Sequence, residues 1–233
     1  MKKQAVILAA GKGTRMGDLT TNIPKPLIEI NGKPFISYII DNLVKAGYER
    51  IAFIVGYKKE QIISYLEREY SELEKIIIPQ DNPQGTGQAV GLVQQYFYGN
   101  FLVIGGDHII SPNDITGLNF EDNFNYVSAL NHPEPQHFGV LKVKGEVLVG
   151  IEEKPAHPSS NLINISLYKF TPEIFAALKR INLSPRGEYE ITDAITLLAS
   201  QKKVRVRPLQ DYFIDLGKKE DLPVVEKQVR QYF

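Results

Sequence analysis

The chain has 233 residues and no net charge, because 27 Lys and Arg side chains balance 27 Asp and Glu side chains. Hydrophobic residues make up 43%, an ordinary globular composition, and a chain this long can bury a sizeable core. The sequence contains no cysteine, which excludes disulfides, thiolate nucleophiles and Cys-ligated metal centres. The balanced charge predicts no binding to nucleic acid, and the apolar runs are too short to span a membrane. We therefore expect a cytoplasmic protein.

Short apolar runs alternate with helical patterns through the first half of the chain. The runs typical of buried strands cover residues 4–9, 50–55, 75–78 and 100–104. The helical patterns cover residues 35–46, 60–70 and 86–96. Such alternation predicts a parallel sheet with helices on both faces, and ligands bind such sheets at the carboxyl ends of their strands.

The second half of the chain has a more mixed pattern. Strands are expected at residues 126–130, 139–143, 148–152, 161–168, 204–208 and 213–216, and helices at 172–178, 190–200 and 220–232. No repeat or linker interrupts the chain. The prediction is a single α/β domain over residues 1–233, Rossmann-like, with a mostly parallel mixed sheet. A nucleotide-binding half would cover about 1–110 and an appended half about 111–233.

A glycine-rich segment, residues 11–16, directly follows the first predicted strand. Glycines allow backbone N–H groups to turn toward phosphates, and Arg15 can donate two hydrogen bonds to phosphate oxygens. The Rossmann fingerprint fails, because Met16 stands where the third glycine is needed, and the P-loop pattern fails as well. The segment indicates a phosphate loop of another kind. The alternative is a plain turn between a strand and a helix.

Lys25 lies between Pro24 and Pro26. Two prolines stiffen the backbone on both sides, which suits a cation that must be aimed at a phosphate. In isolation, an ordinary solvated lysine in a loop would be the favoured interpretation of the segment.

Residues 11–36 resemble the signature of the sugar-1-phosphate nucleotidyltransferases, the family of glucose-1-phosphate thymidylyltransferases and of glucose-1-phosphate and GlcNAc-1-phosphate uridylyltransferases. The family pattern runs G-x-G-T-R-(L/M)-x-P-L-T, then P-K-P, then G-(K/R)-P, and only the first proline is missing, replaced by Asp18. Further segments match in the same order: Gln80, Gly85–Ala89, Gly105–Asp107, Gly139–Val140, Ile151–Pro155, Asn164–Tyr168, Arg186–Asp193 and Phe213–Gly217. The resemblance therefore covers nearly the whole chain. Phe138, Ser166 and Phe213 replace the tyrosine, glycine and tryptophan of the family pattern.

The resemblance implies a role for each matching residue. Arg15 and Lys25 would hold the β- and γ-phosphates, Lys154 the attacking phosphate, and Asp107 and Asp215 a Mg²⁺ ion. The nucleotide would be bound by Leu8, Ala10, Gly11, Gly13, Thr14, Gln80, Gly85 and Thr86. The sugar would be bound by Gly139, Glu153 and Asn164. His108 is the only histidine near this expected site. A direct contact between His108 and the bound groups is the less favoured interpretation.

The implied reaction transfers a nucleotidyl group from UTP or dTTP to a sugar 1-phosphate of the glucose type and releases pyrophosphate. One alternative is transfer from CTP or GTP, or to another sugar or alcohol phosphate. A second is a non-catalytic paralogue that binds nucleotide sugars, which the retention of Asp107 and Asp215 disfavours. A third, an NAD-dependent oxidoreductase, is disfavoured by the failed Rossmann fingerprint. No C-terminal β-helix domain is expected, and a homo-oligomer is left open.

Overall fold

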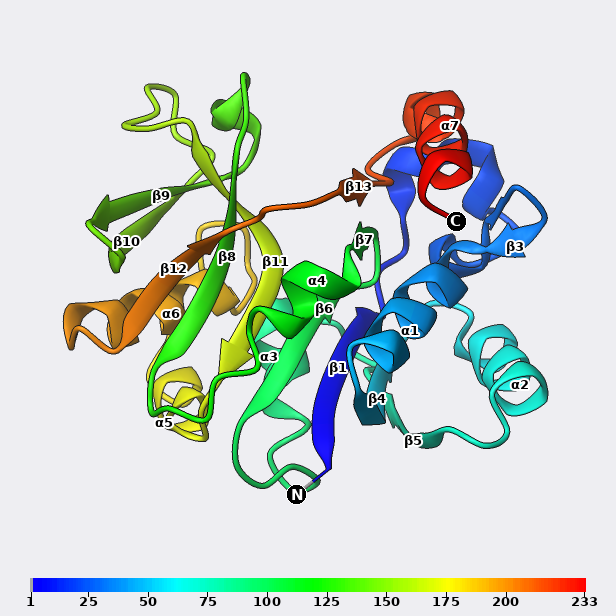
Figure 1. Cartoon of the computed structure of the whole chain (residues 1–233), viewed down its shortest axis with the longest axis horizontal. Helices are drawn as coiled ribbons and strands as arrows, with labels where there is room; N and C mark the ends of the chain where they lie inside the picture. Colours follow the sequence, from blue (N-terminus) through cyan, green and yellow to red (C-terminus); the bar gives the residue numbers. More distant parts are fainter. Residues whose placement is uncertain (1) are drawn as a thin grey trace. The chain divides into compact units, whose positions relative to one another are not determined.

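A computed structural model describes residues 2–233, which group into two compact units (Figure 1). Unit 1 consists of the chain up to Pro83 together with Gly105–Thr116 and Asp211–Phe233. Unit 2 consists of Gln84–Ile104 and Gly117–Gln210. The expected halves divide the chain once near residue 110, whereas the chain leaves unit 1 and returns to it twice. The segments that return carry both aspartates of the expected metal site.

Unit 1 is built on three parallel strands in the order β5 (Glu74–Pro79), β4 (Tyr48–Val55) and β1 (Lys3–Ala9). Its α-helices are α1 (Phe35–Lys45), α2 (Lys59–Glu69), α4 (Pro112–Thr116) and α7 (Leu222–Tyr232). Two short antiparallel pairs complete it: β2 (Glu29–Ile30) with β3 (Lys33–Pro34), and β7 (His108–Ile110) with β13 (Phe213–Asp215). Short 3-10 helices cover Thr14–Thr20, Lys25–Leu27, Pro135–His137 and Lys219–Asp221, the third of them in unit 2.

Helix α1 shows why the periodic segments fold as predicted. Its apolar side chains at Phe35, Ile36, Ile39 and Leu43 are fully buried, as a stripe facing a core requires. Gly47 follows the helix with a φ of 85°, the left-handed conformation that ends many helices. The helix predicted over residues 35–46 is confirmed within one residue.

Unit 2 contains a mixed sheet in the order β6, β11, β8, β12, β10, β9. Strand β12 runs parallel to β8, and the other neighbours are antiparallel. The strands are β6 (Phe101–Gly105), β8 (Asn125–Asn131), β9 (Gly139–Lys144), β10 (Val147–Glu153), β11 (Leu162–Phe170) and β12 (Val204–Pro208). Helices α3 (Thr86–Gly91) and α5 (Glu173–Leu178) pack with α6 (Ile191–Ser200), which lies against β10 and β12. The predicted α/β class is confirmed.

Helix α3 is shorter than the helix predicted over residues 86–96. It ends at Gly91, and the following backbone changes to tighter turns, in which Gln94 N–H donates to Gly91 O and Tyr96 N–H to Val93 O. Glycine is a poor helix former, so a helix that reaches it is easily replaced by turns.

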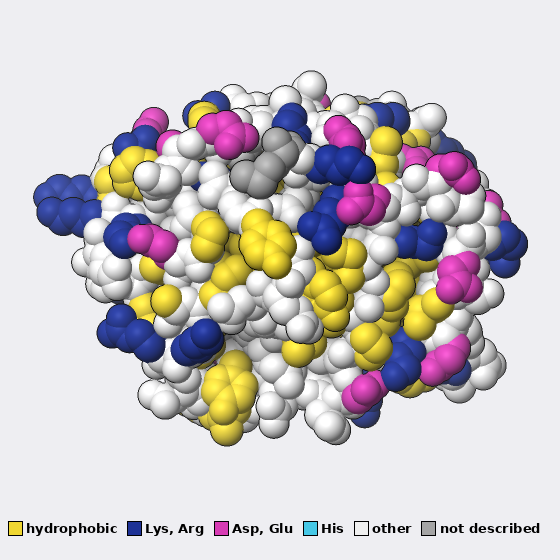
Figure 2. All heavy atoms as spheres, turned by 90° about the horizontal axis from the view of Figure 1, so that it is seen from below, with side chains coloured by type: hydrophobic (Ala, Val, Ile, Leu, Met, Phe, Trp, Pro, Cys, Tyr) yellow, Lys and Arg dark blue, Asp and Glu magenta, His cyan; other side chains and the backbone are white. Residues whose placement is uncertain are grey.

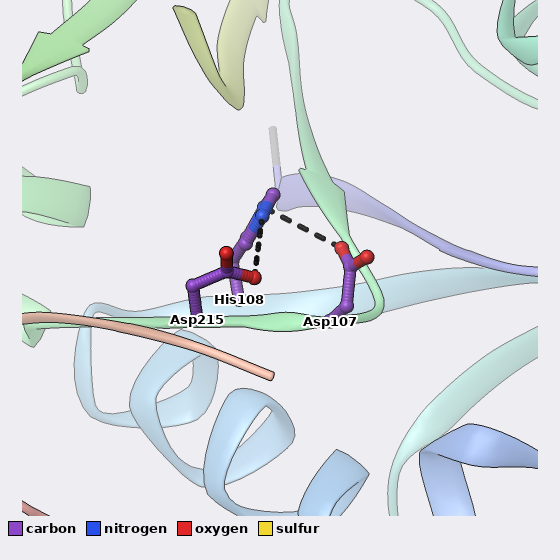
Figure 3. A group of neighbouring side chains, drawn as sticks. All are labelled: Asp107, His108 and Asp215. Atoms are coloured by element: carbon purple, nitrogen blue, oxygen red, sulfur yellow. Dashed lines mark ion pairs between the residues drawn. The ribbon is translucent and has the colours of Figure 1, made fainter. Parts of the chain in front are cut away.

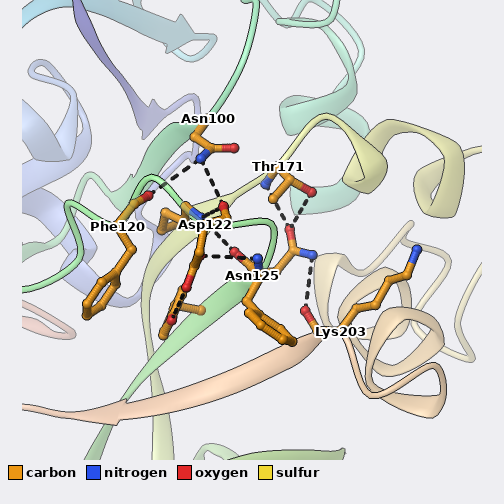
Figure 4. Close-up of polar contacts among 9 residues, drawn as sticks. Asn100, Phe120, Asp122, Asn125, Thr171 and Lys203 are labelled. Atoms are coloured by element: carbon orange, nitrogen blue, oxygen red, sulfur yellow. Dashed lines mark hydrogen bonds and ion pairs between the residues drawn. The ribbon is translucent and has the colours of Figure 1, made fainter.

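A buried polar network closes one end of the sheet in unit 2 (Figure 4). Lys169 is 3% exposed and donates to the Asp122 carboxylate at 3.0 Å and to the backbone oxygen of Phe124 at 2.7 Å. Asn125 accepts from the Thr171 N–H at 2.9 Å. Burial raises the pKa of Asp122, but the hydrogen bonds from Tyr126 and Lys169 outweigh burial and lower it overall. The buried ammonium is therefore paired and fully hydrogen-bonded.

The surface carries both signs of charge, as the balanced composition predicts. Figure 2 shows one face on which apolar side chains lie among lysine and arginine and among aspartate and glutamate side chains. None of the helices in residues 2–233 is both long and apolar enough to cross a membrane.

Candidate active site

The glycine-rich loop of unit 1 begins where β1 ends. Gly13 has a φ of 64°, and a side chain there would put its Cβ 2.9 Å from the Cβ of Lys25. Glycine is therefore needed both for the turn and for the approach of the lysine. The N–H groups of Gly11, Lys12 and Gly13 donate to no other group within residues 2–233. Such N–H groups are available to an anion, as the phosphate-loop interpretation requires.

Lys25 is not a solvated loop lysine. Its side chain is only 10% exposed, and its Nζ lies 2.9 Å from Oδ2 of Asp107. The lysine begins a short 3-10 helix that follows the extended Pro24, which fixes its backbone. The structure thus favours the aimed cation over the alternative that the sequence left open.

Asp107 and Asp215 lie beside each other because of one short ladder. Strand β7 pairs with β13 so that His108 stands directly opposite Asp215, and Leu216 N–H donates to Asp107 O at 3.0 Å. His108 Nδ1 lies 3.5 Å from Asp107 Oδ1, and His108 Nε2 lies 3.4 Å from Asp215 Oδ1. Figure 3 shows the imidazole ring with a dashed line to each of the two carboxylates.

The charges in this cluster support one another. Burial raises the pKa of Asp107, but the His108 ring and the Lys25 ammonium outweigh it and hold the pKa of that carboxyl well below its usual range. Burial lowers the pKa of His108, but the carboxylates of Asp107 and Asp215 outweigh it and raise the pKa overall. The pair of carboxylates therefore attracts positive charge strongly.

The cluster fits a divalent cation. One ligand atom from each of Asp107, His108 and Asp215 lies within 4.8 Å of the other two. Two carboxylate oxygens suit a hard cation, and His108 Nδ1 is buried without a hydrogen-bond partner. The donor set and the unpaired nitrogen both agree with the expected metal site at Asp107 and Asp215.

The residues expected to bind the sugar lie together in unit 2. Gly139 is the ladder partner of Glu153, and a Cβ on Gly139 would lie 3.2 Å from a Glu153 carboxylate oxygen and 3.6 Å from the Asn164 Cβ. The Asn164 amide is held at both ends, since it donates to the Tyr168 hydroxyl at 2.7 Å and accepts from the Ser166 N–H at 3.2 Å. Its orientation is fixed by the protein itself.

Two residues of these segments have left-handed backbone without being glycine. Lys154 has a φ of 45° and Ser166 a φ of 54°. Such conformations cost energy for residues with a Cβ, and they concentrate at functional sites. Ser166 occupies the position at which the family pattern has glycine, the residue that adopts this conformation most readily.

The loop that contains Gly85 and Thr86 is tied to a second loop of unit 2. Gly87 N–H donates to Tyr189 O at 2.8 Å, and Tyr189 N–H donates to Gln84 O at 2.7 Å. The Thr86 hydroxyl accepts from the Ile191 N–H at 3.1 Å. These bonds fix the loop expected to contact the base.

The other nucleotide-binding candidates lie in unit 1. Gln80 follows β5, is 5% exposed, and donates its backbone N–H to Val55 O at 2.7 Å. Leu8 O accepts from the Gly106 N–H at 2.9 Å, and Ala10 O from the Tyr57 N–H at 3.2 Å. Thr14 and Arg15 are exposed at the start of the 3-10 helix after the glycine loop.

Sequence reasoning gave too little weight to two residues. His108 contacts both aspartates, and the signal that could have found it is its position directly after Asp107. Arg186 lies 3.5 Å from Glu153 and 3.6 Å from Glu190, and the acidic residues around it in the sequence were the available signal.

Asp18, which replaces the proline of the pattern, pairs with Lys219 at 2.7 Å.

The profile of the Nucleotidyl transferase family matches residues 4–231, and the chain belongs to this family. It is 41% identical over 220 residues to the bifunctional protein GlmU of Methanococcus aeolicus, covering 94% of this chain and 52% of GlmU. It is 36% identical over 236 residues to the UTP–glucose-1-phosphate uridylyltransferase AglF of Haloferax volcanii, covering 98% and 97%. The chain thus spans about half the length of the GlmU relative and nearly all of AglF.

Solved structures agree with the fold. A UDP-glucose pyrophosphorylase complexed with UDP-glucose is 25% identical, with a TM-score of 0.89 over 100% of both chains. A Bacillus anthracis protein described as a putative glucose-1-phosphate thymidylyltransferase is 24% identical, with a TM-score of 0.89 over 99% of this chain and 96% of that one. The chain therefore has the fold of these nucleotidyltransferases.

Proposed function

We propose that this protein is a sugar-1-phosphate nucleotidyltransferase that uses Mg²⁺. The observation that carries the proposal is the cluster in unit 1, where Lys25 pairs with Asp107 and the glycine loop packs against the same lysine. A fixed cation, free backbone N–H groups and two acidic groups are what binding a metal–triphosphate requires. Membership of the Nucleotidyl transferase family supports the same chemistry.

For the substrates, we propose UTP or dTTP and a sugar 1-phosphate of the glucose type. AglF is named for UTP and glucose-1-phosphate, and one similar structure contains UDP-glucose. The other structure is of a protein described as a putative thymidylyltransferase, so both pyrimidine nucleotides remain in the proposal. The glutamate and asparagine at positions 153 and 164 offer a carboxylate and an amide, which suit sugar hydroxyls.

In the proposed reaction, a phosphate oxygen of the sugar 1-phosphate forms a bond to the α-phosphorus of the nucleotide. The bond from that phosphorus to the bridging oxygen breaks, and pyrophosphate leaves. The attacking oxygen is already anionic, so no general base is needed. The work of the protein is alignment and neutralisation of charge, which explains why a site without a Ser–His pair or a cysteine suffices.

We propose the following roles for the candidate residues. The N–H groups of residues 11–13 bind the triphosphate, with Arg15 and Lys25 on its β- and γ-phosphates. Asp107 and Asp215 hold the metal, which when bound neutralises phosphate charge as a Lewis acid. In unit 2, Lys154 binds the sugar phosphate. Because Lys25 is already oriented by Asp107, little reorganisation is needed when the triphosphate binds.

The test is pyrophosphate release in Mg²⁺. UTP, dTTP, CTP, GTP and ATP are each combined with glucose-1-phosphate, GlcNAc-1-phosphate, mannose-1-phosphate and phosphocholine. We expect turnover with a pyrimidine nucleotide and a glucose-type sugar phosphate. Preference for CTP, GTP or phosphocholine would replace the proposed substrates but keep the reaction class.

A matched pair of variants separates the site from general effects. Asp107→Asn removes one charge of the proposed metal site, whereas Asp81→Asn removes an exposed charge that pairs with Lys59 in the same unit. Only the first substitution should abolish release. Folded protein that binds a nucleotide sugar but releases no pyrophosphate with any pair would refute the enzyme and indicate a binding protein.

A further inference from the structure

We infer that His108 supplies a nitrogen ligand to the cation held by Asp107 and Asp215, so that the site favours Mn²⁺ or Co²⁺ over Mg²⁺. The inference rests on the proposed function only in taking these aspartates as the metal ligands. It goes beyond that function because the family pattern assigns metal binding to the two aspartates alone.

The distances within the cluster carry the first step. The two separations between His108 nitrogens and carboxylate oxygens are 3.4 and 3.5 Å. A normal N–H···O hydrogen bond is about 2.7–3.2 Å long, so these are poor hydrogen bonds. Two ligands of one ion, each about 2.1 Å from it, lie roughly 3.0–3.5 Å apart at angles between 90° and a tetrahedral angle. The two measured separations involve different ring nitrogens, so only one of them can join two ligands of the same ion. The 3.5 Å between His108 Nδ1 and Asp107 Oδ1 matches two such ligands, and one ligand atom from each of Asp107, His108 and Asp215 lies within 4.8 Å of the other two.

The surroundings of one ring nitrogen of His108 also favour a bound metal ion. His108 Nδ1 is buried and has no hydrogen-bond partner. A buried polar atom without a partner is costly and needs a reason. The side chain is 14% exposed, so little water can reach it. A metal ion would supply the missing partner.

The surrounding residues hold the ring in this place. A Cβ on Gly105 would lie 2.8 Å from His108 Nδ1, so any other residue at position 105 would collide with the ring. On another side, the Phe213 ring packs against the imidazole with centroids 5.2 Å apart. The ring is thus confined by the chain before any ion binds.

The oxygen atoms are divided between two partners. Lys25 pairs with Oδ2 of Asp107. Oδ1 of Asp107 and Oδ1 of Asp215 face the imidazole. Lys25 therefore leaves one oxygen of each carboxylate beside the histidine. The ligand set is two oxygens and one nitrogen, with the remaining positions left for water or phosphate oxygens.

The chemistry of this set predicts the choice of metal. Mg²⁺ prefers oxygen ligands only and keeps much of its water. An imidazole nitrogen raises affinity along the series from Mn²⁺ to Co²⁺. Loss of the imidazole should therefore weaken Co²⁺ and Mn²⁺ binding about tenfold or more, and should change Mg²⁺ binding much less.

The experiment uses the whole chain, freed of metal and of any histidine tag. Mn²⁺ bound to the protein is examined by electron spin echo spectroscopy, which detects a directly bonded ¹⁴N, and Co²⁺ binding is measured by visible absorption and calorimetry. His108→Asn is compared with His132→Asn, which removes a partly buried histidine in unit 2. We expect ¹⁴N coupling in the unmodified protein and in the His132 variant, and its loss in the His108 variant.

The unmodified protein alone can refute the inference, so it does not depend on whether the His108 variant folds. Bound Mn²⁺ without ¹⁴N coupling would overturn it, as would equal Co²⁺ affinities in folded His108→Asn and His132→Asn. Turnover with Mg²⁺ combined with either result would keep the proposed function and reject the nitrogen ligand. Conversely, nitrogen-bound Mn²⁺ without any nucleotidyl transfer would reject the proposed function alone.

Discussion

The candidate binding regions of the two units hold their charged side chains in different ways. In unit 1, Lys25 is nearly buried and pairs with Asp107 at 2.9 Å. In unit 2, Arg186 is half exposed and stands 3.5 Å from Glu153. The first pair is held by a proline-flanked turn and a strand ladder, whereas the second lies at the surface with three carboxylates around one guanidinium.

The difference matches the groups each unit is proposed to bind. A metal–triphosphate carries concentrated charge, and fixed charges in a poorly hydrated place stabilise it most. Sugar hydroxyls are neutral and are bound by hydrogen bonds that a partly exposed glutamate can make. Removal of one charge should therefore lower the activity more when the charge lies in unit 1 than when it lies in unit 2.

The largest effect is expected from Lys25→Met. Loss of the aimed ammonium should lower kcat on the order of 10³-fold, because the leaving pyrophosphate would no longer be neutralised. The measurement is pyrophosphate release, with a thermal melt to show that the variant folds. Lys2→Met, which removes an exposed lysine paired with Glu74, should retain full activity. If kcat of the Lys25 variant fell less than tenfold, the expected difference between the two units would be wrong.

A smaller effect is expected from Glu153→Gln. The neutral amide keeps the shape but loses charged hydrogen bonds, so kcat/KM for the sugar phosphate should fall by about 10–100-fold, with the KM for the nucleotide unchanged. Glu152→Gln is the control, since Glu152 points to the other side of β10 and pairs with Lys142. Equal losses in both variants would show that Glu153 has no special contact with the sugar.

Asp122→Asn should affect stability and leave activity unchanged. The buried Lys169 would lose its carboxylate, and the free energy of unfolding should fall by about 1–2 kcal/mol, a figure reduced for the partial exposure of Asp122. Urea unfolding at pH 7 measures it, with the exposed Glu121→Gln as control. A variant as stable as the parent would mean that the backbone oxygens alone satisfy the ammonium.

The same variant has a pH dependence with a definite sign. The pKa of Asp122 is lowered from 3.8 in the folded state, so its contribution is present above about pH 4 and is lost as pH falls through the folded value. The difference in stability between the parent and Asp122→Asn should therefore narrow as the pH is lowered below 4. If the difference in stability did not change with pH, the lower stability of the variant would come from the altered shape of the side chain and not from its lost charge.

The smallest effect compares Ser166→Gly with Ser166→Ala. Both variants lose the hydroxyl, but only alanine keeps a Cβ in the left-handed conformation at a φ of 54°. The glycine variant should be the more stable by about 1 kcal/mol, measured by thermal unfolding. If alanine were equal to glycine, the backbone of unit 2 would relax easily at this position.

Much of the fold was predictable because its elements are periodic or continuously apolar. The strands at residues 4–9 and 50–55 and the helix at 35–46 stand where the pattern places them. The short strands of unit 1 were harder to predict. Strand β7 has three residues, too few to show a period, and its partner β13 lies more than 100 residues away.

The candidate site shows the same limit. Glycine spacing and the prolines around Lys25 indicated a phosphate site, but burial and the pairing with Asp107 decided against a solvated lysine. His108 could not be weighed correctly, because its contact with Asp215 depends on the register of the short ladder. The left-handed backbone at Ser166 was hidden, since serine rarely adopts it.

The interleaved course of the chain has a consequence for synthesis on the ribosome. Unit 2 is complete once residue 210 has emerged, although unit 1 contains the beginning of the chain. Unit 1 is complete only after residues 211–233 are made, because β7 has no partner strand until β13 is made. Domains that fold during synthesis usually do so from the N-terminus onward. Here we expect unit 2 to be completed before unit 1, and Asp215 is the last charged member of the candidate metal site to be made.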